Sequence, residues 1–274
     1  MKKPFFSIII PTLNEEKFLP HLLDSLVVQT NKDFEVIVVD GKSKDNTVQI
    51  AKTYISQLPS LVVCVADRAS LPHQRNIGAE TAKGSWFVFV DADTVLLPYT
   101  LERIYHYIKF HDVHILTSWF TPDSEEDKDA RFIVLTHLLF ESFKMIKRTT
   151  APGPFSVVER DAFYQVGKYD VEHPFLEDQD FSRRATKIGF SIDIIRETLY
   201  IWSLRRYRKE GTFRVVQEYM KTILPILFLG KTPKNLVGYA MGGHVFSKRK
   251  PTVKQSLLKK AEKQIRSLMQ DLFE

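Results

Sequence analysis

The residues best suited to chemistry are two aspartates, Asp91 and Asp93, which stand two positions apart directly after an apolar run at residues 86–90. That run is rich in Val and Phe, as is typical of a strand buried on both faces in a parallel sheet. Ligands of open α/β sheets bind beyond the carboxyl ends of such strands. Because close carboxylates repel each other unless a cation lies near them, the pair indicates a divalent ion such as Mg²⁺, which fills its remaining shell with phosphates and water. The alternative is that Asp93 caps a helix beginning near Pro98 and that Asp91 is solvated.

A second acidic group stands at the start of a helical pattern that runs to Lys187, and its members are Glu177, Asp178 and Asp180. Acidic side chains stabilise the first turn of a helix through its dipole, which accounts for one or two of the three. A positioned carboxylate is also a common general base. We therefore predict that at least one of these acids is catalytic.

A basic run at residues 203–209 contains Arg205, Arg206, Arg208 and Lys209. Arginine-rich loops bind diphosphates through paired hydrogen bonds, because the planar guanidinium holds several donors in a fixed arrangement. The alternative is a solvated surface without a ligand. The run is therefore a candidate diphosphate site.

The first 90 residues show the pattern of a sheet that would position these groups. Apolar strands at residues 5–10, 34–39, 61–66 and 86–90 alternate with helical segments, one of them expected over 73–82. This alternation predicts parallel strands joined by right-handed crossovers. The ends of three strands then place polar side chains at one edge of the sheet. The first strand, turn and helix are typical of nucleotide binding, although the turn lacks the glycines of a dinucleotide motif.

The remaining elements follow from periodicity and from chain-breaking residues. We expect a helix over residues 97–110, a strand over 113–119, an acidic loop over 121–129 and a helix over 132–146. The segment 151–154, with two prolines and a glycine, breaks the chain. A strand over 155–158 and a short helix over 160–166 follow it.

Charge and composition narrow the class of protein. The chain has 274 residues, 44% of them hydrophobic, and a net charge of +6, and its basic residues cluster in the C-terminal third. This balance favours anionic partners such as phosphates or a lipid surface, and without a matching motif we expect no nucleic acid partner. The single cysteine, Cys64, excludes a disulfide within the chain. No stretch reaches about 18 apolar residues and no signal-peptide cleavage pattern is present, so we expect a cytoplasmic protein.

The last part of the chain contains two apolar segments. Residues 213–229 are strongly apolar, and residues 252–273 place Leu, Ile and Met on one helical face with Lys and Arg opposite. The second pattern predicts an amphipathic helix. Such a helix packs on its own domain or on a partner helix, or it lies on a lipid surface.

Four segments of the chain resemble, in sequence, order and spacing, the inverting family-2 glycosyltransferases with a GT-A fold. They are SIIIPTLNEEKFL, VIVVDGKSKDNT, RNIGAETAKGSWFVFVDADT and FLEDQDFSRRA, and their order and spacing match over roughly residues 5–210. The resemblance implies an α/β fold of GT-A type over residues 1–210, with a mostly parallel central sheet flanked by helices. Residues 211–274 are then a helical C-terminal extension and a candidate for membrane association.

The resemblance also implies roles for individual residues. The residues implied to bind the nucleotide sugar are Pro11, Thr12, Asn14, Glu15, Asp40, Arg75, Asp91, Arg205 and Arg206. The residues implied to bind Mg²⁺ or Mn²⁺ are Asp93 and Asp91. The base is implied to come from the pair Glu177 and Asp178, and it is usually the aspartate. Gly41 stands where many members have a second aspartate after the second strand, which leaves the base open among Glu177, Asp178 and Asp180.

The implied reaction is the transfer of one hexose from a UDP- or GDP-sugar, with inversion, to an acceptor hydroxyl or a lipid phosphate. The acceptor would be a saccharide or a lipid-linked molecule of cell envelope biosynthesis, reached from the cytoplasm or from the inner face of the membrane. The Gln-x-x-Arg-Trp motif of processive synthases is absent, which favours single transfer. The alternatives are a glycoside hydrolase, which also uses two carboxylates, and a catalytically silent nucleotide-sugar-binding or scaffolding protein of the same fold. A hydrolase would need neither the basic run at residues 203–209 nor the nucleotide-type start of the chain. The complete pairs Asp91–Asp93 and Glu177–Asp178 argue against the silent protein.

Overall fold

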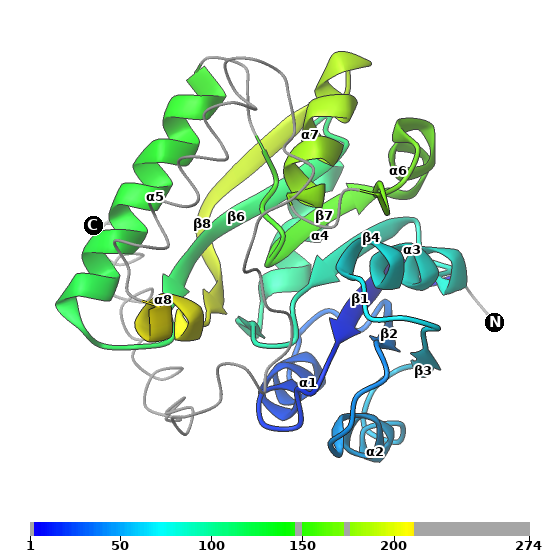
Figure 1. The fold of residues 1–274 in the computed structure, drawn as a ribbon. Coiled ribbons are helices and arrows are strands. Elements are labelled where there is room, and N and C mark those ends of the chain that lie inside the picture. The colour runs from blue at the N-terminus through cyan, green and yellow to red at the C-terminus, as the bar shows by residue number, and fades with distance from the viewer. Residues whose placement is uncertain (1–2, 146–149, 173–175, 211–274) are drawn as a thin grey trace.

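The structure is a computed structural model that describes residues 3–145, 150–172 and 176–210. A single eight-stranded sheet lies at its centre, with the strand order β3-β2-β1-β4-β7-β6-β8-β5 (Figure 1). The expected extension over residues 211–274, with its apolar segments 213–229 and 252–273, lies outside the described residues. The division into two domains therefore stays a prediction.

The first half of the sheet is parallel, as the alternating pattern predicts. Its strands are β1 (Phe6–Thr12), β2 (Phe34–Asp40), β3 (Leu61–Val65) and β4 (Trp86–Val90). Every residue of β1, β2 and β4 is buried, because their apolar runs have neighbours on both faces. The connecting helices are α1 (Leu19–Val27), α2 (Thr47–Thr53) and α3 (Leu71–Thr81).

The second half of the sheet is mixed. Its strands are β5 (Val95–Leu96), β6 (Ile115–Pro122), β7 (Phe155–Glu159) and β8 (Ile192–Trp202). Strand β7 runs antiparallel to both β4 and β6, whereas β8 runs parallel to β6 and antiparallel to β5. The reversal at β7 brings the loop before this strand to the edge of the sheet where β4 ends, since Phe155 pairs with Val90.

Helices cover both faces of the sheet. The remaining ones are α4 (Thr100–Phe110), α5 (Asp127–Met145), α6 (Arg160–Val166), α7 (Glu177–Lys187) and α8 (Arg205–Glu210). Alternate side chains of β1 point to opposite faces. Ile8 belongs to a core cluster with Leu22 of α1 and Leu101 of α4, and Ile9 belongs to a second cluster with Ala79 of α3 and Phe163 of α6.

Three features differ from the sequence-based expectations. The acidic segment at residues 121–129 is not a loop throughout, because β6 continues to Pro122 and α5 begins at Asp127. The basic run is not a loop, because its arginines form α8. Strands β5 and β8 were not expected: β5 has only two residues, and the exposed Arg196 and Glu197 interrupt the apolar pattern of β8, where its register against β6 also shifts.

Candidate functional site

The two aspartates that follow β4 lie where the parallel strands end, as the sequence predicts. Asp93 does not cap α4, whose N-cap is Tyr99; its carboxylate instead pairs with Arg205. Burial raises the pKa of Asp93 to about 6, against the opposing effect of Arg205, and burial also raises the pKa of Asp91. Each aspartate has an arginine partner, and these two arginines organise the site.

Arg75 of α3 bridges the end of β4 and the start of α7. Its side chain is fully buried, and its Nη1 donates to Oε1 of Glu177 at 2.6 Å. Its Nη2 donates to Oδ1 of Asp91 at 2.9 Å and to the carbonyl of Gly153 at 2.8 Å. A buried charge is tolerated when it is paired and hydrogen-bonded in this way. Arg75 therefore fixes three segments that are distant in the sequence.

The three acids of α7 have different surroundings. Glu177 is buried against Arg75, and burial raises its pKa to about 7. Asp178 accepts hydrogen bonds from the backbone N–H groups of Gly153, at 2.7 Å, and Gln179, at 2.8 Å. Burial raises the pKa of Asp178, although Arg75 and these N–H groups oppose the effect.

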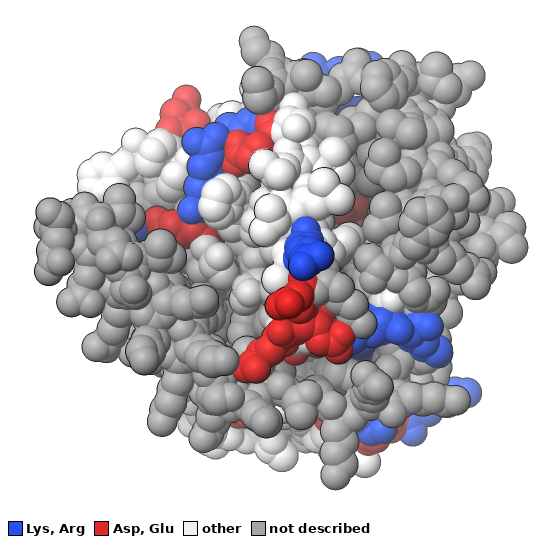
Figure 2. Space-filling model, turned by 90° about the vertical axis from the view of Figure 1, so that its left-hand side faces the viewer, with Lys and Arg blue, Asp and Glu red and all other residues white. Residues whose placement is uncertain are grey.

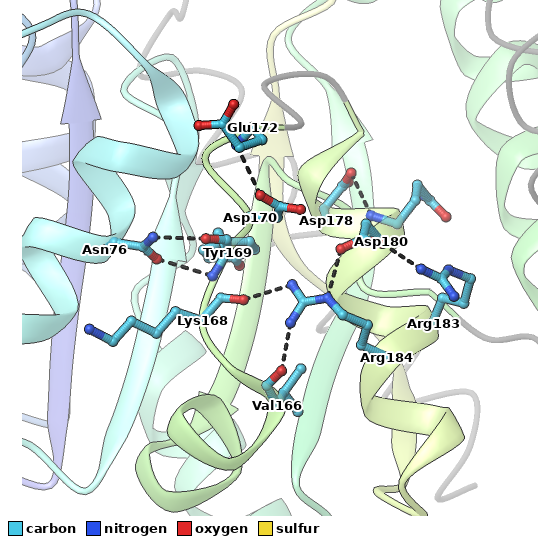
Figure 3. A network of polar contacts seen from close by, with 11 residues as sticks. Asn76, Val166, Lys168, Tyr169, Asp170, Glu172, Asp178, Asp180, Arg183 and Arg184 are labelled. Atoms are coloured by element: carbon cyan, nitrogen blue, oxygen red, sulfur yellow. Dashed lines mark hydrogen bonds and ion pairs between the residues drawn. The ribbon is translucent and has the colours of Figure 1, made fainter. Parts of the chain in front are cut away.

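Asp180 belongs to a separate network that fastens α7 to the neighbouring loop (Figure 3). Its carboxylate accepts from Nη2 of Arg183 and from Nε of Arg184, both at 2.7 Å. Arg184 also donates to the carbonyls of Val166 and Lys168. These contacts hold the helix that carries Glu177 and Asp178, and they occupy the carboxylate of Asp180.

Arg205 of α8 forms the second bridge, between the turn after β1 and the turn after β4. Its Nη1 and Nη2 donate to the two carboxylate oxygens of Glu15 at 2.9 and 2.8 Å, and its Nε lies 2.9 Å from Oδ2 of Asp93. The guanidinium lies over the ring of Phe18, 4.2 Å from the ring centre. Burial raises the pKa of Glu15 to about 7, against the effect of Arg205. Arg206 follows Arg205 on α8 and is partly buried.

The residues expected at the nucleoside end lie together at the ends of β1 and β2. Pro11 and Thr12 stand opposite Val39 and Asp40 in the register, and the hydroxyl of Thr12 donates to Asp40 at 3.0 Å. Asn14 adopts a left-handed backbone conformation with a φ of 53°, and its side-chain oxygen accepts from the N–H of Lys44. The strand ends thus bring these residues to the same edge as Asp91.

Sequence reasoning missed three contributors to the site. Gly153 binds Asp178 through its N–H and Arg75 through its carbonyl, yet the sequence indicates only a chain break there. Phe18 has the spacing of an ordinary core position, although it also contacts Arg205. Asp123 accepts two hydrogen bonds from Arg208, at 2.8 and 2.7 Å, and so anchors α8 to the end of β6. Among these, only the Pro-Gly-Pro sequence carries a local signal.

The acidic residues at the strand ends fit a hard divalent cation. Carboxylate oxygens are the ligands that Mg²⁺ and similar ions prefer, and such ions usually combine one or two of them with substrate phosphates. Asp91 and Asp93 provide such a pair. Within the described residues, no cluster of three or more His, Cys, Asp or Glu side chains forms a complete protein cage for a metal. The donor set therefore fits an ion that is held jointly by the protein and a phosphate.

Comparison with known proteins identifies the family of residues 7–167, which include most of the residues of the site. The family model for glycosyl transferase family 2 matches residues 7–167. An uncharacterized glycosyltransferase of Haemophilus influenzae is 28% identical over 181 residues, which are 64% of this chain and 60% of the relative. A PGL/p-HBAD biosynthesis glycosyltransferase of Mycobacterium tuberculosis is 40% identical over 114 residues, which are 41% of this chain and 44% of the relative. The chain thus spans less than two thirds of either relative.

Solved structures show the same fold. Residues 1–349 of TarS from Staphylococcus aureus, in complex with UDP, superpose with a TM-score of 0.58 at 24% identity, over 73% of this chain and 60% of that one. The mannosyltransferase PcManGT from Pyrobaculum calidifontis, in complex with GDP-Man and Mn²⁺, superposes with a TM-score of 0.62 at 18% identity, over 85% of this chain and 67% of that one. The α/β architecture is therefore that of the GT-A glycosyltransferases, as the resemblance implies.

Proposed function

The chain belongs to glycosyl transferase family 2, and from this premise we propose that it transfers one sugar from a nucleotide diphosphate sugar to an acceptor, with inversion. One observation carries the proposal: the bridges formed by Arg75 and Arg205 gather Glu15, Asp91, Asp93 and Glu177 at the edge of the sheet where the parallel strands end. Asp178 adjoins this group through Gly153. The edge therefore combines acids for a cation and a proton with cations for a diphosphate.

Asp178 is the proposed base. The carboxylate of Glu177 is bound by Arg75 and that of Asp180 by Arg183 and Arg184, so arginine side chains already engage both of these acids. Asp178 is instead oriented by two backbone N–H groups, and burial raises its pKa. It would take the proton of the acceptor hydroxyl as the acceptor oxygen bonds to the anomeric carbon. The bond from that carbon to the diphosphate breaks at the same time, and the electron pair leaves on the phosphate oxygen.

Arg205 is the proposed diphosphate ligand, with Arg206 beside it. A guanidinium binds phosphate oxygens in pairs, and a fixed cation stabilises the charge that develops on the leaving group. Asp93, with Asp91, would hold Mg²⁺ or Mn²⁺, and such an ion acts as a Lewis acid toward the leaving diphosphate. The structure of PcManGT, which is a complex with both GDP-Man and Mn²⁺, supports this choice.

The ends of β1 and β2 form the proposed nucleoside site, with Pro11, Thr12, Asn14 and Asp40. Arg75 has no exposed side-chain surface, so we propose that it acts on the nucleotide through Asp91, which it orients. Three solved structures of the same fold are complexes with UDP, UDP-GlcNAc and GDP-Man, which supports a UDP- or GDP-hexose as the donor.

We propose a saccharide or lipid-linked acceptor of the cell envelope. One relative is a poly(ribitol-phosphate) β-N-acetylglucosaminyltransferase and another belongs to PGL/p-HBAD biosynthesis. We further propose that the protein works at the cytoplasmic face of a membrane. No described helix has the length and apolar character needed to cross a membrane.

Exposed apolar side chains on α5 support this surface association. Val134, Leu135 and Leu138 are 59%, 63% and 60% exposed. The side of the molecule that carries α5 shows uncharged surface bordered by both acidic and basic side chains (Figure 2). The basic residues of segment 211–274 would add attraction to anionic lipids, at about 1 kcal/mol for each side chain near the surface.

A panel of UDP- and GDP-sugars, with glycolipid and saccharide acceptors, tests the proposed reaction. We expect transfer from one donor and a product with the opposite anomeric configuration. Release of a sugar from a glycoside without a nucleotide donor would indicate a hydrolase instead. Donor binding without transfer to any acceptor would favour the silent binding protein, and a retained configuration would exclude single displacement.

A further inference from the structure

All three guanidinium nitrogens of Arg205 contact carboxylates. Two of its nitrogens bind both oxygens of Glu15, and the third binds Oδ2 of Asp93. The three side chains are only 14%, 7% and 12% exposed. One oxygen of the proposed metal ligand Asp93 is therefore covered by a positive charge that belongs to the protein itself.

This position of Arg205 is built by several contacts. The ring of Phe18 supports the guanidinium from one side, with a separation of 4.2 Å. Arg208, three residues further along α8, binds Asp123 with two hydrogen bonds and so anchors the same helix. Because the paired charges are mostly excluded from water, they hold each other more strongly than a surface pair does.

From this geometry we propose that Arg205 is an internal counter-ion that competes with the divalent cation for Asp93 and releases it to the donor's diphosphate. The inference rests on the proposed function, because it takes Asp93 as a metal ligand. Two cations at one carboxylate oxygen repel each other, so the Arg205–Asp93 contact weakens the binding of a metal ion alone. A diphosphate offers the guanidinium a new doubly hydrogen-bonded partner. Nucleotide and metal then raise each other's affinity, because each stabilises the arrangement in which Arg205 has left Asp93.

Titration of the full chain with Mn²⁺, followed by the electron paramagnetic resonance of the free ion, tests this competition directly. In the wild type we expect weak Mn²⁺ binding that becomes at least about tenfold tighter with UDP or GDP present, a change of about 1.4 kcal/mol. Arg205→Gln should bind Mn²⁺ alone about tenfold tighter than the wild type. It should bind the nucleotide about tenfold more weakly, and each change again equals about 1.4 kcal/mol of binding free energy. A residue that only stabilises the fold would not move these two affinities in opposite directions.

Matched variants show whether a change in Mn²⁺ affinity comes from competition between Arg205 and the ion for Asp93, from a change in net charge, or from misfolding. Arg205→Lys keeps the positive charge and should stay near the wild type in Mn²⁺ affinity. Arg196→Gln removes the same charge from an arginine that is 63% exposed and pairs with Glu141 away from the site, and it should change neither affinity. Because Arg205→Gln leaves the buried Glu15 without its partner, the double variant Glu15→Gln/Arg205→Gln removes both charges and should show the same gain in Mn²⁺ affinity.

Two outcomes overturn the proposal, and they are distinguishable. If the single and double variants bind Mn²⁺ alone no more tightly than the wild type, while nucleotide still strengthens Mn²⁺ binding, Arg205 does not compete for Asp93. If neither the wild type nor any variant binds Mn²⁺, with or without nucleotide, the metal role of Asp93 fails and the competition fails with it.

Discussion

Replacing Arg75 by Met removes the charge at the centre of the site while keeping most of the side-chain volume. Arg75 is fully buried and donates to Glu177, Asp91 and the carbonyl of Gly153 at 2.6–2.9 Å. Removing one partner of a buried ion pair costs about 3–5 kcal/mol, because the other charge stays buried and unpaired. We therefore expect Arg75→Met to lose about that much of the free energy of unfolding at neutral to alkaline pH.

The loss should depend on pH in a defined direction. Burial raises the pKa of Glu177 from 4.5 to about 7, so the folded state favours its protonated form. The stability that the folded state gains by holding a proton on Glu177 is fully present below pH 4.5, and it is lost as the pH rises through about 7. Arg75 lowers the pKa of Glu177, so its removal raises that pKa further. The free energy of unfolding of the variant should therefore be furthest below that of the wild type at about pH 8. The difference should be smaller at about pH 5, where Glu177 is neutral.

Urea denaturation of both proteins at the two pH values measures this difference. Arg103→Met is the matched control, because Arg103 forms a surface pair with Glu197 and both side chains are half exposed. The control should lose no more than about 1 kcal/mol. Arg75→Met/Glu177→Gln should recover part of the loss at high pH. Equal destabilisation at both pH values, or a loss no larger than that of Arg103→Met, would refute the reasoning.

Three further predictions concern the metal, the loop before β7 and the membrane. Asp93→Ala should weaken donor binding and remove its dependence on Mg²⁺ or Mn²⁺; unchanged calorimetric affinity, with and without chelator, would remove the metal from Asp93. Gly153→Ala places a methyl carbon 3.2 Å from Nη2 of Arg75 and 3.5 Å from Oδ2 of Asp178. We expect this variant to lower kcat by about tenfold through a displaced base and to keep its donor affinity; a wild-type kcat would contradict that. The full chain should float with anionic liposomes at low salt and less at high salt, and protein that stays at the bottom throughout would reject membrane association.

The parts of the site that the sequence predicts are those set by one strand and the turn after it. Asp91 and Asp93 follow an unbroken apolar run, so the strand and its polar end are both visible in a few residues. The first-turn position of Glu177 and Asp178 in α7 is similarly local. The parallel half of the sheet follows from the alternation of strands and helices, because each crossover fixes the direction of the next strand.

The partners of these residues are not local, and the sequence does not reveal them. Arg205 and Glu15 are 190 positions apart, and their contact depends on β8, whose apolar pattern is broken by exposed charges. The role of Gly153 lies in its backbone N–H and carbonyl, which every residue except proline also carries. A contact of this kind has no signature in side-chain chemistry.

The proposed mechanism is tested most sharply by the rate of sugar transfer by Asp178→Asn, measured with the donor that the nucleotide-sugar panel identifies. The amide keeps the size of the carboxylate but cannot take a proton. We expect transfer to be abolished and the donor affinity, measured on the same protein, to stay close to that of the wild type. Transfer at the wild-type rate by Asp178→Asn, or loss of transfer only in Glu177→Gln or Asp180→Asn, would contradict the assignment of Asp178 as the base.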